Sequence, residues 1–104
     1  MARRYDLECP VARTLDVIGD RWTALILREL FQYRDRRFQD LERAFDGLTP
    51  SVLSARLKDL EANGVITSRF YTTHPPRHEY FLTPKGRKLG PVLMAMMKWG
   101  EENT

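Results

Sequence analysis

The sequence is poor in cysteine, since Cys9 is the only one among 104 residues. A disulfide within the chain is therefore excluded. The sequence also lacks any run of about 18 apolar residues, the length needed to span a membrane as a helix. Its first residues, Met1-Ala2-Arg3-Arg4, contain no apolar signal core. These absences predict a cytoplasmic protein that contacts no membrane and whose thiol is reduced at rest.

The features of catalytic and metal sites are missing as well. His74 and His78 are four positions apart, but prolines separate them, and no cluster of carboxylates or cysteines completes a metal site. No glycine-rich phosphate loop is present, and Cys9 has no histidine partner at a spacing typical of cysteine nucleophiles. We therefore expect no enzyme activity, no metal ion and no cofactor.

The length of 104 residues and the hydrophobic content of 42% allow one domain, residues 1–104, with a modest core that benefits from a partner. The net charge of +3 is small but unevenly distributed, because residues 34–88 contain 11 Lys and Arg against 7 Asp and Glu. The positive excess therefore lies in the middle of the chain, where it favours binding to an anionic partner such as nucleic acid.

Residues 37–63 have the pattern of two short helices joined by a tight turn. Apolar residues recur at helical spacing in both segments, Phe38, Leu41 and Phe45 in the first and Leu53, Leu57 and Leu60 in the second. Asp46-Gly47 ends the first helix, because Gly tolerates the left-handed conformation that reverses the chain. Thr49-Pro50 begins the second helix, with Thr as N-cap and Pro at the first position, and Asn63-Gly64 ends it.

The second helix has a small and polar outer face. Ser51, Ala55, Lys58 and Ala62 lie opposite its apolar residues and are flanked by Ser54 and Asp59. Small residues allow a helix to approach a major groove closely, while hydroxyls and Lys reach base edges and phosphates. The alternative is an ordinary solvated helix face, which periodicity alone favours.

Residues 65–82 are expected to form a hairpin. Segments 65–71 and 78–82 are rich in β-branched and aromatic residues, which is typical of strands. Residues 72–77 form the loop, with Pro75-Pro76 at its tip. Arg77 and His78 beside the tip offer positive charge, conditional on pH for His78, to a phosphate or minor groove. A solvated tip residue is the alternative for Arg77.

The two ends of the chain are expected to be helical. A short helix ends at Gly19, and a longer one is capped by Asp20. Residues 84–100 form a helix capped by Thr83 and kinked at Gly90-Pro91. This last helix has apolar residues on more than one face, namely Leu89, Val92, Leu93, Met94, Met96, Met97 and Trp99. One small domain cannot cover all of them, so we expect a second subunit to do so, with a methionine-rich ligand site as the weaker alternative.

The order of these motifs resembles that of HxlR-type transcriptional regulators. The matching elements are Cys9-Pro10, Leu15, Gly19 with Trp22, Ile26-Leu27 with Leu30, Arg37-Phe38 with Leu41, residues 53–58, Pro75-Pro76, Glu79-Tyr80, Leu82-Thr83, Lys85-Gly86, Leu89 and Trp99. The resemblance implies a mainly α fold with a small β-hairpin, a winged helix-turn-helix whose N- and C-terminal helices form a dimer interface. It makes residues 49–63 the recognition helix and residues 72–77 the wing. Two departures are the Gly-free segment 32–36, where the family has a Gly turn, and His78 in place of an aliphatic residue.

The function implied is sequence-specific DNA binding by a homodimeric transcriptional regulator. Two-fold pairing places two recognition helices about one duplex turn or a multiple of it apart, which predicts a pseudo-palindromic operator. The expected DNA contacts are Arg36 and Arg37, which open the first helix of the motif, with Thr49, Ser51, Val52, Ser54, Ala55, Lys58, Arg69, Arg77 and His78. The expected dimer contacts are Leu89, Val92, Leu93, Met96, Met97 and Trp99. A winged helix that binds only other proteins is the alternative.

Cys9 is the candidate redox sensor. It precedes Pro10 at the start of a helix, where the helix dipole and nearby Arg13 favour the reactive thiolate. In several HxlR-type proteins a cysteine at this place senses oxidants, quinones or aldehydes, and the resemblance implies this role for Cys9. A small-molecule effector is a further expectation. The structural alternative for Cys9 is a small buried apolar residue.

Overall fold

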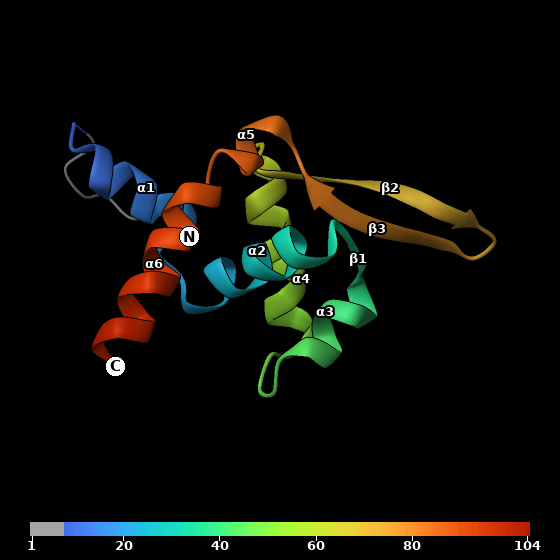
Figure 1. The fold of residues 1–104 in the computed structure, drawn as a ribbon. Helices are drawn as coiled ribbons and strands as arrows, with labels where there is room; N and C mark the ends of the chain where they lie inside the picture. Colours follow the sequence, from blue (N-terminus) through green and yellow to red (C-terminus); the bar gives the residue numbers. More distant parts are fainter. Residues whose placement is uncertain (1–7) are drawn as a thin grey trace.

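Helices dominate the chain, and three strands form one small antiparallel sheet (Figure 1). The computed structural model describes residues 8–104, except the side chains of Thr73 and Pro76, so the expectation for residues 1–4 lies outside the described residues. The elements in order are α1 (Pro10–Ile18), α2 (Arg21–Tyr33), β1 (Asp35–Arg37), α3 (Phe38–Ala44), α4 (Pro50–Ala62), β2 (Ile66–Thr73), β3 (Pro76–Leu82), α5 (Pro84–Arg87) and α6 (Gly90–Asn103). Helices α1 and α6 lie at one end, and the β2–β3 hairpin projects at the other.

The predicted ends of the second helix of the motif, α4, and the predicted turn at Gly47 are confirmed, whereas α3 ends at Ala44 and does not include Phe45. Thr49 Oγ1 accepts a hydrogen bond from the Val52 N–H at 3.3 Å, which caps α4. Gly47, between α3 and α4, has a φ of +86°, a conformation that few other residues adopt. Asp20 likewise caps α2, because its Oδ2 accepts from the Trp22 N–H at 2.9 Å. These local contacts fix where each helix starts and therefore which face it presents.

The core consists of the apolar faces of α2 and α4 together with residues at the start of the hairpin. The predicted inward residues Leu53, Leu57 and Leu60 of α4 are all buried. The whole buried cluster is Ile18, Ile26, Leu27, Leu30, Leu41, Leu48, Leu53, Leu57, Leu60, Val65, Ile66 and Leu82. None of these residues belongs to α6, so this helix adds nothing to the fully buried core.

The strand β1 was not predicted. It pairs with β3, which makes a three-stranded sheet of order β1-β3-β2. Arg36 and Arg37 therefore lie in a strand and do not open α3 as predicted, because the helix begins at Phe38 with Arg37 as its N-cap. A short edge strand is held by backbone hydrogen bonds, which the side chains of a charged segment do not reveal.

The hairpin is longer than predicted, and its loop is shorter. Thr72 pairs with Arg77 and Thr73 with Pro76, which leaves His74-Pro75 as the turn. The predicted loop 72–77 is therefore wrong in its bounds. Proline is tolerated as the first residue of a strand, where Pro76 lies, so the Pro-Pro pair did not mark the full extent of a loop.

The C-terminal segment consists of two helices, where one kinked helix was predicted. Helix α5 ends at Arg87, and Lys88 and Leu89 separate it from α6. Gly90-Pro91 are the first residues of α6, and the predicted kink is therefore wrong. Proline fits the first turn of a helix because its missing N–H is not needed there.

Candidate nucleic-acid interface

Helix α4 presents the polar face that the sequence predicted. Ser51 and Lys58 are exposed, and Ser54 and Ala55 are half-buried along the same helix. Val52 differs from the prediction in that it packs partly against the core. The hydroxyls, the methyl group and the ammonium group on this face are short enough or flexible enough to approach a groove, and the carboxylates of Asp59 and Glu61 are exposed on the same helix.

An ion-pair network that the sequence analysis missed orients α4. Arg56 Nη1 lies 3.8 Å from Asp20 Oδ1, at the N-terminus of α2, and 3.4 Å from Asp59 Oδ2 on its own helix. At the other end, the Ser68 hydroxyl of β2 donates to Glu61 Oε2 at 3.2 Å. The spacing of Arg56 and Asp59 could have predicted the pair within the helix, but the contacts between elements depend on the fold.

The C-terminus of α4 is joined to α5 by hydrogen bonds to backbone carbonyls. Lys85 Nζ donates to the Asn63 carbonyl at 2.7 Å, and the Thr83 hydroxyl donates to the Gly64 carbonyl at 2.6 Å. Thr83 Oγ1 also accepts from the Gly86 N–H at 3.0 Å, which confirms it as an N-cap. The recognition helix, the base of the hairpin and α5 are therefore connected through a few short contacts.

The wing, residues 72–77, and its neighbour His78 lie at the end of the hairpin. Arg77 and His78 are exposed, and the His78 ring packs against Phe70 with centroids 4.3 Å apart. His78 Nδ1 lies 3.3 Å from the Ser68 hydroxyl oxygen. A concavity of about 420 Å³ separates this end of the hairpin from the start of α3, and Gln39 and Arg77 are among its polar lining residues.

Two of the predicted DNA-contacting arginines also lie close to acids of the chain. Arg36 Nη2 lies 4.0 Å from the buried Glu29, and its guanidinium stacks 4.2 Å from the Tyr33 ring centroid. Arg69 Nε donates to Glu79 Oε1 at 2.7 Å, and this hydrogen bond raises the pKa of Arg69. Within residues 8–104, Arg37, Lys58 and Arg77 form no such ion pair, which leaves their charge available to a ligand.

The sheet separates Arg69 from the DNA-facing side of α4. Side chains alternate between the two faces of a strand, so the cross-strand partners Arg69 and Glu79 share one face and Ser68 and Tyr80 share the other. Ser68 contacts α4 through Glu61, so its face is the one that the helices cover. Arg69 therefore lies on the outer face of the sheet, away from α4.

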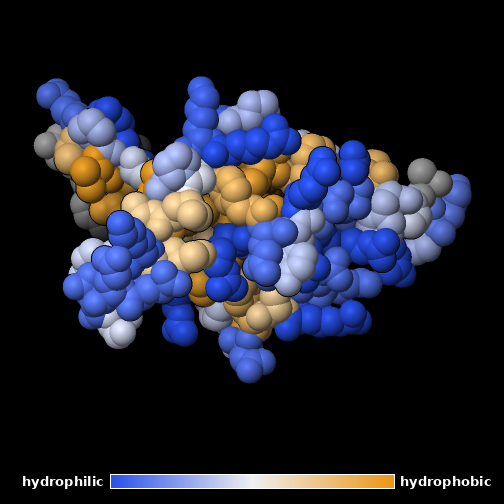
Figure 2. Space-filling model, viewed as in Figure 1, coloured by the Kyte–Doolittle hydropathy of each residue, from blue (hydrophilic) through white to orange (hydrophobic). Residues whose placement is uncertain are grey.

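The predicted dimer residues divide into two groups. Leu89 and Leu93 pack partly against the core of their own chain. Val92, Met96, Met97 and Trp99 are exposed, Trp99 by 63%. Val92 and Met96 also line a groove of about 560 Å³ together with Val11 and Leu15 of α1. In Figure 2, hydrophobic residues lie over α1, the first part of α6 and the middle of the molecule, whereas the C-terminal end of α6 and the hairpin end are mainly hydrophilic.

Cys9 lies beside this apolar surface, at the N-cap of α1. Its thiol is half-buried and free of any disulfide, and its carbonyl accepts the Arg13 N–H at 3.0 Å. The side chain makes no capping hydrogen bond. The position at the start of α1 is as predicted.

The described residues also bear on metal sites and membrane spans. In the part of the chain that the structure describes, no three His, Cys, Asp or Glu side chains are grouped as metal ligands would be. The helices within residues 8–104 are too short or too polar to cross a membrane.

Comparisons with known proteins identify a family for this chain. Residues 17–104 match the model of the family described as HxlR-like helix-turn-helix. The uncharacterized HTH-type transcriptional regulator sll1512 of Synechocystis is 42% identical over 94 residues, which are 90% of this chain and 69% of that protein. The HTH-type regulator YybR of Bacillus subtilis is 38% identical over 91% of this chain and 75% of its own. The solved structure of the redox regulator HypR in its reduced form has a TM-score of 0.86 at 37% identity and covers 91% of this chain and 93% of that one.

Proposed function

This chain belongs to the HxlR-like helix-turn-helix family, a family of DNA-binding transcriptional regulators, and we propose that it reads a pseudo-palindromic operator as a homodimer. In this proposal α4 enters the major groove, and residues 72–77 form a wing that contacts the adjacent backbone. The observation that carries it is the outer face of α4, which is small, polar and held in place by Arg56. An operator-bound dimer would present two such faces.

Base reading is assigned to α4. Ser51, Ser54 and Lys58 carry hydroxyls and an ammonium group that can bond to base edges, while Ala55 leaves room for the close approach of the duplex. Thr49, whose hydroxyl caps the helix, and the partly packed Val52 lie at its start, where a groove-bound helix first meets the DNA.

Backbone anchoring is assigned to Arg37 and Arg77, which form no ion pair within residues 8–104, with the exposed imidazole of His78 beside Arg77. Contacts to phosphates fix position and affinity but carry no sequence information. Arg36 and Arg69 are paired with Glu29 and Glu79, so we assign them a supporting role in placing β1 and the hairpin.

The experiment compares binding to an operator duplex and to a scrambled duplex at several salt concentrations. Ser54→Ala and Lys58→Ala are expected to weaken operator binding about tenfold and to reduce discrimination between the duplexes. Arg77→Ala is expected to weaken both equally and to lower the salt dependence by about one counterion. The matched control Lys98→Ala removes a cation of α6, at the end of the molecule opposite the hairpin, and should cost less than Arg77→Ala. Equal losses on both duplexes for all variants would refute this division of roles.

A second copy of the chain is the proposed occupant of the apolar surface on α1 and α6. Helix α6 has 14 residues, many of them apolar, and buries none of them fully. A soluble monomer rarely exposes such a patch, and self-association covers the same surface on both copies. Met96→Glu is expected to give a monomer in light scattering. Lys98→Glu introduces the same residue about 200° around the helix and should leave the dimer intact; if both variants remain dimeric, the interface lies elsewhere.

We also propose that oxidation of Cys9 controls operator binding. Support comes from the solved reduced and oxidized forms of HypR, which is described as a redox regulator, and from the place of Cys9 beside the proposed interface. Diamide would oxidise two Cys9 thiols to one disulfide between subunits, and would itself take up the two electrons and two protons. We expect diamide to change operator binding in the wild type and not in Cys9→Ser. Unchanged wild-type binding would remove the sensor role and leave the DNA-binding proposal standing.

A further inference from the structure

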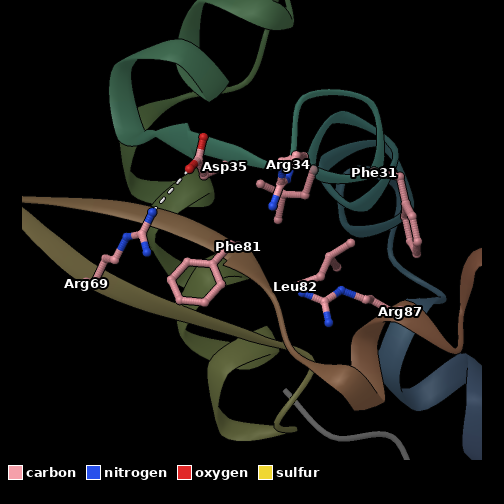
Figure 3. Close-up of a pocket in the computed structure, with 8 residues that line it drawn as sticks. Phe31, Arg34, Asp35, Arg69, Phe81, Leu82 and Arg87 are labelled. Carbon is pink, nitrogen blue, oxygen red and sulfur yellow. Dashed lines mark hydrogen bonds and ion pairs between the residues drawn. The ribbon is translucent and has the colours of Figure 1, made fainter.

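We infer that a pocket on the outer face of the sheet binds a small organic anion with an apolar body, such as an aromatic carboxylate. The pocket has a volume of about 360 Å³ and lies between the end of α2, the sheet and α5 (Figure 3). This size falls within the range of about 300–1,000 Å³ that is usual for small-molecule sites. It suits a ligand with a single ring.

The apolar part of the pocket comes from two elements that meet there. Leu30 and Phe31 come from the last turns of α2, and Phe81 and Leu82 from the end of β3. Leu30 and Leu82 are buried, and Phe31 remains exposed at 36%. A planar apolar ligand would find both aliphatic and aromatic surface here.

Arginine side chains supply the charge of the pocket. Arg34, Arg69 and Arg87 line it against a single acid, Asp35, which already lies 3.4 Å from Arg69 Nη2. Arg34 and Arg87 form no ion pair within the described part of the chain, and Figure 3 shows them reaching toward the same space, Arg34 from the position after α2 and Arg87 from α5. Two uncompensated guanidinium groups above an apolar floor are complementary to a carboxylate attached to a ring, because guanidinium groups pair with carboxylates through parallel hydrogen bonds.

The backbone at Arg34 is a second, independent observation. Arg34 has φ 69° and ψ −59°, the dihedral angles of a rare and strained γ-turn. Glycine would adopt this conformation at less cost, yet an arginine occupies it and lines the pocket. Strained residues of this kind cluster at active sites and ligand-binding sites. The position therefore favours a role for the Arg34 guanidinium over a purely structural role for the turn.

The location of the pocket suggests what binding does. It contacts the hairpin through Arg69 and Phe81 and contacts α5 through Arg87, and α5 leads directly into α6. An anion bridging Arg34 and Arg87 would tie the end of α2 to α5 and so bias the angle between the hairpin and the proposed dimer helix. Arg69 and Phe81 lie on the sheet face opposite to Ser68, the residue that contacts α4, so the ligand and DNA are not expected to compete for one surface. This regulatory step rests on the proposed function, whereas binding of the anion does not.

Binding is tested on the reduced full chain, without DNA, by amide chemical shifts at constant ionic strength. Benzoate is the probe, benzyl alcohol keeps its ring without the charge, and acetate keeps the carboxylate without the ring. We expect saturable shifts at Phe31, Arg34 and Arg87 with benzoate, and at least tenfold weaker binding of the other two. Arg87→Gln should weaken benzoate binding about tenfold. The control Lys88→Gln removes a neighbouring exposed charge outside the pocket and should change nothing.

Three results would overturn the site. The first is an absence of saturation by benzoate up to about 10 mM. The second is acetate binding as tight as benzoate binding, and the third is an equal loss of benzoate affinity in Arg87→Gln and Lys88→Gln. Either of the last two would mean that the ligand senses only diffuse positive charge. Arg34→Gly provides a second variant that should weaken benzoate binding while keeping the fold. If benzoate binds but leaves wild-type operator affinity unchanged, the regulatory step is wrong, and the DNA-binding proposal is judged separately by the operator measurements.

Discussion

Arg34 has a strained backbone conformation, and its side chain lines the inferred anion pocket. Its φ of 69° is the only positive φ of a non-glycine residue within the described chain. The conformation lets the chain leave α2 and enter β1 without an intervening loop. The absence of a glycine in segment 32–36 was visible in the sequence, but the position that needed a positive φ was not.

Arg34→Gly is predicted to raise the free energy of unfolding by about 1 kcal/mol, because glycine relieves the strain at positive φ. Urea unfolding measured by circular dichroism would show the difference. Gln32→Gly, two residues earlier in the regular part of α2, is the matched control and should destabilise by about 1 kcal/mol. A loss of stability in Arg34→Gly would mean that its side chain supports the fold itself.

Tyr80 is predicted to make stability sensitive to alkaline pH. Burial raises the pKa of its hydroxyl above the ordinary 10.0, and Glu61 acts in the same direction. The folded chain therefore binds the Tyr80 hydroxyl proton more tightly than the unfolded chain. The contribution of this difference to the free energy of unfolding is fully present below pH 10.0 and is lost as pH rises through the higher folded pKa. Unfolding free energies measured from neutral to alkaline pH should fall less steeply in Tyr80→Phe. Identical slopes in the two proteins would contradict this assignment.

Among the helices and strands, the sequence could predict those whose ends depend on contacts between residues close in the chain. The starts of α2 and α4 were predictable because Asp20 and Thr49 bond to backbone groups two or three residues away. Strand β1 depends on pairing with β3, more than 40 positions later in register, as for Asp35 with Phe81. The residue pattern of one segment does not show which distant segment pairs with it.

The junction of α5 with the base of the hairpin leaves no room at Gly86. A Cβ there would lie 2.0 Å from the Val65 carbonyl oxygen, which is backbone and cannot rotate away. Gly86→Ala is predicted to destabilise the fold by about 3 kcal/mol, measured by thermal or urea unfolding.

Gly100→Ala in α6 is the matched control for this substitution. A methyl group at Gly100 meets no described atom within 4 Å, and alanine is the better helix former by about 1 kcal/mol. It should therefore be neutral or stabilising. Similar losses in both variants would show that the contact with Val65 is not the cause.

At the scale of the whole molecule, two surfaces of different character lie apart, and the hairpin projects at the end opposite to α1 and α6. The polar face of α4 and the apolar face of α6 were predictable from helical periodicity, and the wing from its strand pattern. Which cations lie beside acids was not predictable. Arg36 and Arg69 lie within 4.0 Å of Glu29 and Glu79, which come together only in the folded chain, whereas Arg37 and Arg77 form no ion pair within residues 8–104.

The central claim is that two copies of α4 read a sequence together. Selection from a randomised duplex library tests it most directly, with reduced protein at near-physiological salt so that nonspecific phosphate binding is suppressed. We expect enrichment of an inverted repeat whose half-sites lie about one helical turn, or a multiple of it, apart. A library that emerges without any enriched sequence would contradict the account and favour a winged helix that binds other proteins.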